Sequence, residues 1–99
     1  MPKRPVHPGE ILSEDVLAPL RMSANRLAQA LHVPTNRITE IIAGRRTVTA
    51  DTALRLSRYL GTSPEFWLGL QAEYDLDSAR VEAAQRIKRE IRPLLRPSA

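Results

Sequence analysis

Apolar residues between positions 23 and 46 recur at helical spacing in two short runs with a tight turn between them. The first run holds Leu27, Ala28 and Leu31, and the second holds Ile38, Ile41 and Ile42. The first run predicts a helix over residues 24–31, because the Ser23 hydroxyl can accept an unpaired N–H of its first turn. Val33 would fill the angle between the helices, and the small Ala28 lets their backbones approach closely. This arrangement is typical of a helix-turn-helix.

The outer side of the second helix is polar, which leaves it free to lie in a DNA major groove. The candidate base-reading residues on it are Thr35, Asn36, Arg37, Thr39 and Glu40. Arginine can donate two hydrogen bonds to guanine and asparagine can pair with adenine, each pair discriminating by about 1–3 kcal/mol. Arg37 or Asn36 can therefore set the sequence that is read. The predicted phosphate contacts flank the two helices and are Ser23, Asn25, Arg26, Arg45, Arg46 and Thr47.

Positive charge is concentrated around this motif. The net charge is +4, but seven arginines lie between residues 21 and 58 against only Glu40 and Asp51. A clustered positive face is what phosphate neutralisation requires, whereas scattered charges only keep a domain in solution. Two of these arginines, Arg55 and Arg58, lie on the next helix, where a solvated or salt-bridged face is favoured over a phosphate contact. Residues 80–96 form a second basic region.

Helical signals fill the rest of the chain, and no alternation of period two predicts a strand. A first helix is expected over residues 8–17, with Pro8 near its start and Pro19 ending it. Thr49 caps a helix over residues 50–60 that stops at Gly61. Its expected buried residues are Ala53, Leu54, Leu56 and Leu60. Ser63, Pro64 and Glu65 start another helix that ends near Asp75, and a further amphipathic helix is expected over residues 77–91. The predicted fold is all-α, a five-helix bundle with an additional C-terminal amphipathic helix.

A chain of 99 residues is one domain. We expect a flexible N-terminal segment at 1–6, a DNA-binding domain at 7–76, a C-terminal helix at 77–92 and a frayed tail at 93–99. The apolar stripe of the last helix holds Val81, Ala84, Ile87 and Ile91. This stripe can fold back on the core, pair with a second copy or bind a partner chain, and the sequence leaves the three open.

Several kinds of site are disfavoured. The chain has no cysteine, and His7 and His32 stand apart from carboxylate clusters, so no metal or other cofactor is expected. His7 is assigned to helix initiation. No nucleophile elbow or glycine-rich phosphate loop is present, so we expect neither an enzyme nor a small-molecule ligand. No long apolar run predicts a membrane span, and Lys3 and Arg4 precede prolines rather than a signal peptide's apolar stretch, which favours the cytoplasm.

Three stretches resemble the HigA-type antitoxins, which are Cro-like and phage-repressor-like (XRE) helix-turn-helix proteins. They are HPGEIL at 7–12, SANRLAQALHV at 23–33 and ITEIIAGRRTVTADTALRLSRYLGTSPEFWLGLQAEYDL at 38–76. The resemblance implies a phage-repressor-like bundle that neutralises a cognate ribosome-dependent messenger-RNA nuclease toxin and, as a dimer, represses its own operon. The chain departs from phage-type motifs at His32, where glycine is usual; histidine tolerates left-handed backbone at modest strain.

A dimer is also expected from geometry, because one short helix reads only a few base pairs and selectivity needs two half-sites. The predicted dimer interface is Trp67, Leu68 and Tyr74, with Trp67 equally compatible with the core, and Phe66 is assigned to the core. Two alternatives stay open: a stand-alone transcriptional regulator without a toxin, and a pure protein-interaction module. The arginines around a polar recognition face argue against the second alternative.

Overall fold

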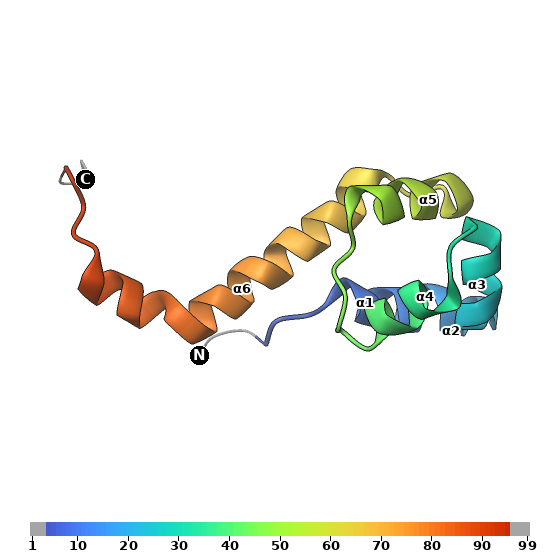
Figure 1. Ribbon diagram of the computed structural model, residues 1–99, viewed down its shortest axis with the longest axis horizontal. Helices are drawn as coiled ribbons and strands as arrows, with labels where there is room; N and C mark the ends of the chain where they lie inside the picture. The colour runs from blue at the N-terminus through green and yellow to red at the C-terminus, as the bar shows by residue number, and fades with distance from the viewer. Residues whose placement is uncertain (1–3, 96–99) are drawn as a thin grey trace.

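The computed structural model describes residues 4–95, and within them every regular element is helical (Figure 1). The elements are α1 (Pro8–Ile11), η1 (Leu12–Leu17), α2 (Ala18–Leu20), α3 (Ala24–Leu31), α4 (Thr35–Ile42), α5 (Ala50–Leu60) and α6 (Pro64–Glu90). The predicted all-α fold is confirmed. Residues 1–3 of the predicted flexible segment and 96–99 of the predicted frayed tail lie outside the described residues. Residues 4–7 and 91–95 form no helix.

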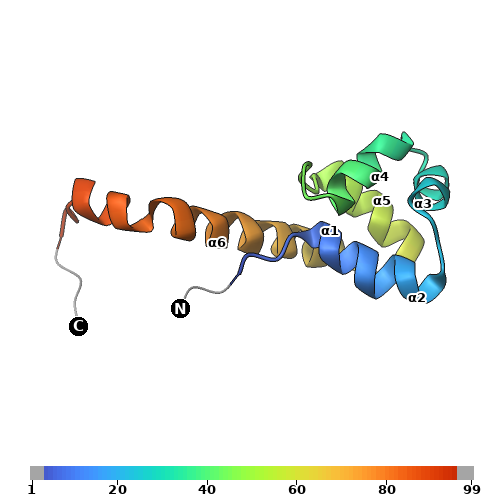
Figure 2. The same cartoon turned by 90° about the horizontal axis from the view of Figure 1, so that it is seen from below.

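The first helix is longer than the sequence predicted. Elements α1, η1 and α2 follow one another without a break, so the prediction that Pro19 ends the helix at Leu17 is wrong (Figure 2). In an α-helix the proline would lack an N–H and its ring would meet the carbonyl of the preceding turn. Here η1 is π-helical, and the Ala18 N–H reaches back five residues to the Ser13 carbonyl. This wider spacing accommodates Pro19, and the helix ends instead at Arg21, whose φ is 51°.

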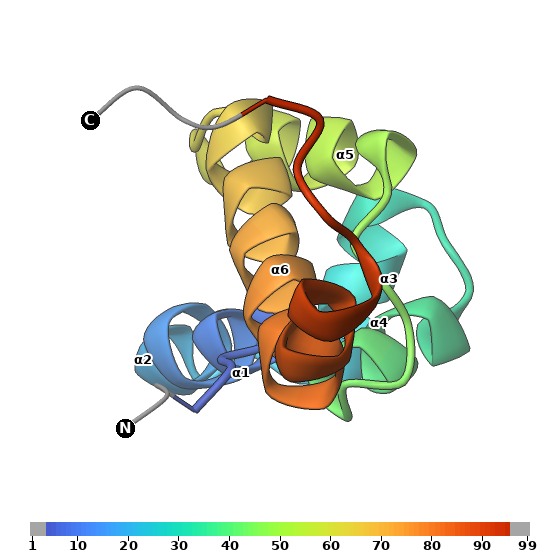
Figure 3. The ribbon, with the colours of Figure 1, turned by 90° about the vertical axis from the view of Figure 1, so that its left-hand side faces the viewer.

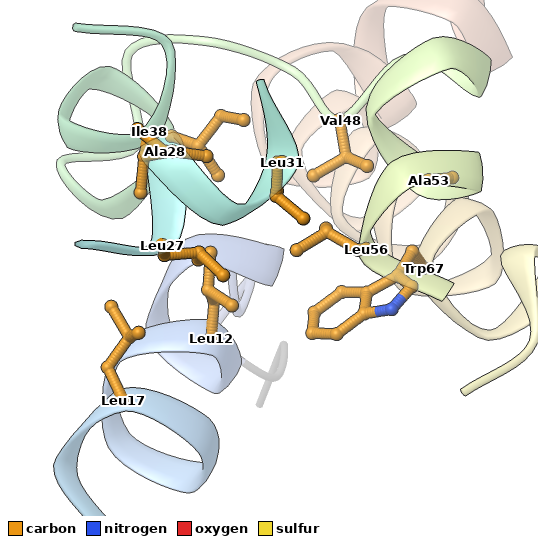
Figure 4. Close-up of a cluster of buried hydrophobic side chains, with 11 residues drawn as sticks. Leu12, Leu17, Leu27, Ala28, Leu31, Ile38, Val48, Ala53, Leu56 and Trp67 are labelled. Carbon is orange, nitrogen blue, oxygen red and sulfur yellow. The ribbon is translucent and has the colours of Figure 1, made fainter. Parts of the chain in front are cut away.

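The hydrophobic core lies where α3, α4, α5 and the start of α6 meet the first helix (Figure 4). Its least exposed large side chains include Leu12, Leu27, Ile38, Ile41, Leu56 and Trp67. The predicted inward faces of α3 and α4 are confirmed, and Val33 packs against the cluster between them. The prediction that Leu54 is buried is wrong, because its side chain is 59% exposed. Leu54 lies one turn before the exposed Arg58 on the outer face of α5, while Ala53 points inward.

The start of α1 is held against the end of α4. His7 caps α1, as predicted, because its Nδ1 accepts a hydrogen bond of 2.9 Å from the Gly9 N–H. The buried His7 ring also meets the Tyr74 ring edge-on, with centroids 4.8 Å apart. Gly9 packs so tightly on α4 that a Cβ atom there would overlap the Ile41 carbonyl oxygen. Only glycine allows this approach, so residues 7–9 help to set where α4 lies.

Helix α6 is one continuous element, so the predicted division near Asp75 is wrong. The chain contains no proline between Pro64 and Pro93, and the polar residues around Asp75 are compatible with a solvated helical turn. The first half of α6 packs on the core, and the second half projects from it as a rod (Figures 1 and 2). Figure 3 views the molecule from this projecting end. The molecule therefore measures 52 × 22 × 21 Å. The predicted apolar stripe of the last helix does not fold back on the core, since Val81, Ile87 and Ile91 remain exposed.

Two buried side chains, Gln71 and Trp67, fix the first half of α6 through hydrogen bonds. The Gln71 side-chain oxygen accepts a 2.8 Å hydrogen bond from the Val48 N–H, and its amide nitrogen donates to Asp75 at 3.0 Å. The Trp67 indole N–H donates to the Thr62 hydroxyl at 2.7 Å. The loop that follows α4 is thus tied to α6 through the backbone of Val48, which keeps the exit of α4 in a fixed position.

Candidate nucleic-acid interface

Helices α3 and α4 form the predicted motif with the predicted caps. The Ser23 hydroxyl accepts a 3.1 Å hydrogen bond from the Arg26 N–H, which starts α3. His32 ends α3 in left-handed backbone, with φ 57° and ψ 47°, so histidine does supply the geometry usually given by glycine. The Val33 N–H returns to the Ala28 carbonyl at 3.0 Å. The tight turn is therefore closed by backbone bonds as well as by the apolar contact of Val33.

The five candidate base-reading residues all lie on α4, and they divide into two groups. Thr35, Asn36 and Thr39 are exposed. Arg37 and Glu40 are partly buried and ion-paired: Arg37 Nη1 is 2.7 Å from Asp51 Oδ2, and Glu40 Oε1 is 2.8 Å from Arg46 Nη2. In this structure Glu40 neutralises a predicted phosphate-binding arginine, an ion pair that sequence reasoning missed.

The predicted phosphate residues flank α4 on both sides, and all six are exposed. They are Ser23, Asn25 and Arg26 at the entrance of α3 and Arg45, Arg46 and Thr47 after α4. Asn25 also has a structural contact, since its side-chain oxygen accepts a 2.7 Å hydrogen bond from the Thr35 hydroxyl. This bond joins the first turn of α3 to the first turn of α4.

A small polar hollow lies between α4, the loop after it and the start of α5. Its lining residues are Arg37, Arg46, Thr47, Thr49, Asp51 and Thr52. Two arginines, three hydroxyls and the N-terminus of α5 therefore converge on one side of the motif, around a single carboxylate. Such a surface suits an anionic ligand, because guanidinium groups, hydroxyls and free helix N–H groups all donate hydrogen bonds.

Asp51 is the charged residue of this surface that the sequence analysis did not assign to the interface. Asp51 Oδ2 accepts hydrogen bonds from Arg55 Nε at 2.9 Å and from Arg37 Nη1 at 2.7 Å. These hydrogen bonds, first from Arg55 and then from Arg37, hold the pKa of the Asp51 carboxyl below its usual range. The spacing of Asp51 and Arg55, four residues apart on one helix, is a signal that could have found the pair. The prediction that Arg55 lies on a solvated or salt-bridged face is confirmed.

The predicted dimer interface needs correction. Trp67 is fully buried in the core and cannot offer surface to a second copy, whereas Phe66, assigned to the core, is 45% exposed and packs edge-on against the Trp67 ring. The two neighbours exchanged roles because consecutive residues on a helix point about 100° apart, and the sequence does not say which one faces inward. Tyr74 is partly buried against His7, and Leu68 is the member of the predicted set that remains exposed.

Comparison with known proteins decides the family. The helix-turn-helix family model matches residues 15–67, which is more than half of the chain. Virulence-associated protein I of Dichelobacter nodosus is 54% identical over 74 residues, covering 75% of this chain and 68% of that protein. An addiction-module antidote protein of the HigA family from Coxiella burnetii is 52% identical, with a TM-score of 0.87 over 92% of this chain and 99% of that chain.

The chain belongs to the HigA-type family of helix-turn-helix antitoxins. The Pseudomonas aeruginosa antitoxin HigA, solved with the higBA promoter, is 43% identical, with a TM-score of 0.90 over 93% of this chain and all of that one. HigA-type antitoxins form a regulatory class without enzymatic activity, so the chain is not expected to have an active site. No described helix is both long and apolar enough to cross a membrane. Within residues 4–95, no three potential metal-binding side chains are grouped together.

Proposed function

We propose that this HigA-type chain is a cytoplasmic antitoxin that also represses its own operon. Helices α3 and α4 bind operator DNA, and the chain neutralises a cognate ribosome-dependent messenger-RNA nuclease toxin. The observation that carries the proposal is the polar face of α4, flanked by arginines, on a scaffold that matches a promoter-bound HigA with a TM-score of 0.90. A stand-alone regulator without a toxin is the alternative, and it would use the same DNA-binding face.

In this proposal α4 enters the major groove with Thr35, Asn36 and Thr39 toward the base edges. Arg37 reads a base from the side of the helix nearest α5, and Glu40 acts indirectly by orienting Arg46. The residues that flank α4 hold the register through phosphate contacts, which are sequence-independent. These are Ser23, Asn25, Arg26, Arg45, Arg46 and Thr47. Neither a cofactor nor a small-molecule ligand takes part.

The direct test of DNA reading uses two duplexes of equal length and base composition. One carries the promoter upstream of the chain's own gene, and the other carries the same bases in scrambled order. We expect the promoter duplex to bind at least about a thousandfold more tightly at physiological salt. Equal affinity for the two duplexes would remove operator binding from the proposal.

The toxin role needs a separate test. We expect the product of a neighbouring gene to co-purify with this chain when both are expressed. We also expect this chain to stop messenger-RNA cleavage by that product in a translation assay. If the chain binds its promoter but the neighbouring product neither binds nor is inhibited, the stand-alone regulator is the correct reading.

We propose that the dimer forms through the distal half of α6 rather than through Trp67. Leu76, Ala83 and Ile87 form a stripe along the projecting half of α6, and Ile91 continues it at the C-cap of the helix. Leu76, Ile87 and Ile91 are each about half exposed or more. A solvent-exposed helix of this length gains stability when an apolar face is covered. Residues 76–83 carry a net charge of −1 and residues 84–92 carry +3. An antiparallel pairing of two copies therefore places opposite charges together, and a parallel pairing does not.

Ile87→Lys tests this interface. Because Ile87 has no core contact to lose, the variant should fold normally but sediment as a monomer at concentrations at which the unmodified chain is a dimer. Gln85→Lys is the matched control, since residue 85 lies on the opposite side of the same helix and receives the same charge. An Ile87→Lys variant that remains fully dimeric would place the interface elsewhere.

A further inference from the structure

One carboxylate oxygen of Asp51 joins α4 to α5, and Arg55 extends this connection to the end of α3. Arg37 donates to this oxygen from the recognition helix α4, and Arg55 donates to it from the next turn of α5. Arg55 then uses its Nη1 group to donate to the Leu31 carbonyl at 2.9 Å and to the His32 carbonyl at 3.4 Å. Both carbonyls belong to the end of α3, where the backbone lacks helical partners. The chain of contacts therefore runs from the turn of the motif, through α5, to the side chain of Arg37.

This connection immobilises a side chain that would otherwise be flexible. An arginine has about 2 kcal/mol of rotamer entropy to lose when it is held in one position. The Arg37 side chain is 28% exposed, whereas that of the ion-paired Arg46 on the same surface is 41% exposed. Arg55 is itself fixed by the α3 carbonyls, so Asp51 holds Arg37 against a rigid support and not against another mobile side chain.

The contact also leaves Arg37 able to bind something else. A guanidinium group has five N–H donors, and the bond to Asp51 engages Nη1 alone. Within residues 4–95, the other guanidinium donors of Arg37 have no hydrogen-bond partner. Two of them are enough for a guanine edge. Asp51 can therefore remain in place while Arg37 reads a base.

A carboxylate on a DNA-binding face has an electrostatic cost, because it repels phosphate. Within residues 21–58 the acidic residues are Glu40 and Asp51, and each is paired with an arginine. Asp51 lowers the positive charge available for sequence-independent attraction and gives Arg37 a fixed direction. Both effects favour a specific sequence over random DNA.

We propose that Asp51 is a specificity-determining positioning residue, which orients the Arg37 guanidinium for base reading by tying it to Arg55 and the turn of the motif. The inference rests on the proposed operator binding. Removing the Asp51 charge should have an effect on DNA binding that removing a purely structural residue would not have. Removing the Asp51 charge should raise affinity for random DNA while lowering the preference for the operator.

Asp51→Asn is the primary variant, measured with the promoter duplex and its scrambled counterpart. We expect affinity for the scrambled duplex to rise, its salt slope to steepen by about one, and the preference for the promoter to fall about fivefold or more. Asp15→Asn is the matched control: it makes the same change of charge at an exposed position of η1, outside α3, α4 and the proposed dimer interface. The control should keep the preference, and Asp51→Glu, which retains a carboxylate, should keep most of it.

A double-mutant cycle isolates the link to Arg37. In an Arg37→Ala background, Asp51→Asn should no longer change the preference for the promoter, because the residue that Asp51 orients is absent. An equal loss of affinity for both duplexes in Asp51→Asn, or the same loss of preference with and without Arg37, would overturn the inference.

A measurement without DNA separates this inference from the proposed function. Nitrogen relaxation of arginine Nε groups in the free protein should report an ordered Arg37 that becomes mobile in Asp51→Asn, with the exposed Arg26 as a mobile reference. A mobile Arg37 in the unmodified chain contradicts the holding role, even if the operator is bound. An ordered Arg37 with no promoter preference contradicts the proposed operator binding instead.

Discussion

Replacing Gly9 by alanine tests how closely the first helix is packed on the recognition helix. A Cβ atom at this position would lie 2.7 Å from the Ile41 carbonyl carbon and 2.9 Å from the Ile42 Cα, besides overlapping the Ile41 oxygen. All of these are backbone atoms, which cannot rotate away as the end of a side chain can. The two helices must therefore separate.

The expected cost follows from two opposing terms. Overpacking of a tight contact costs about 1–3 kcal/mol, and a clash between backbones belongs at the upper end of that range or above it. Alanine gains up to about 1 kcal/mol over glycine in a helix. The net loss should be about 2 kcal/mol, which is a large part of the 5–15 kcal/mol typical of a domain. Operator affinity should also fall, because α4 moves.

Urea unfolding of the purified variants measures this loss in the free energy of unfolding, provided that the slope of free energy against urea concentration is unchanged. Gly69→Ala is the matched control, because a Cβ there meets nothing within 4 Å and residue 69 lies inside α6. That control should gain about 0.5–1 kcal/mol. A Gly9→Ala variant within about 0.5 kcal/mol of the unmodified chain would refute the close approach of α1 and α4.

Three further outcomes are expected. Gln71→Leu should lower the free energy of unfolding by about 1–3 kcal/mol in chemical denaturation, because the buried Val48 N–H loses its acceptor; an unchanged midpoint would mean that this bond is dispensable. Burial lowers the pKa of His7 below its ordinary value, so the unfolded chain binds the proton more readily than the folded chain. The free energy of unfolding should therefore be highest above about pH 6.5 and fall as the pH drops toward the folded pKa of His7. His7→Asn, which keeps a capping side chain, should lose this pH dependence. In gel-shift titrations Arg37→Ala should weaken operator binding far more than random binding, whereas Arg46→Ala should weaken both with a salt slope shallower by about one; equal losses in Arg37→Ala would remove it from the base-reading set.

The helices with clear end signals could be predicted from the sequence. The predicted N-caps of α3, α5 and α6 are confirmed, and they are Ser23, Thr49 and Ser63. Gly61 ends α5 as predicted. These signals are local, because a cap needs only a side chain and an N–H a few residues away. The end of the first helix was not predictable in this way, because a π-helical segment before Pro19 shifts the backbone and no residue type in the sequence indicates that segment.

The candidate interface was predictable as a set of residues but not as a set of contacts. All the proposed DNA contacts lie on or beside α3 and α4. The pairing of Arg37 with Asp51, which is 14 residues away, depends on how α4 meets α5 and therefore on tertiary packing. Trp67 and Phe66 exchanged their expected roles for the same reason, since burial on α6 is decided by where α5 and the first helix lie.

A hydroxyl-radical footprint of the unmodified chain on its own promoter tests the central claim most directly. We expect two protected half-sites whose centres lie about one turn of DNA, roughly 10 base pairs, or a whole number of turns apart, because a dimer presents two copies of α4 to one face of the duplex. Continuous protection without paired half-sites, or no protection at concentrations that coat random DNA, would contradict it.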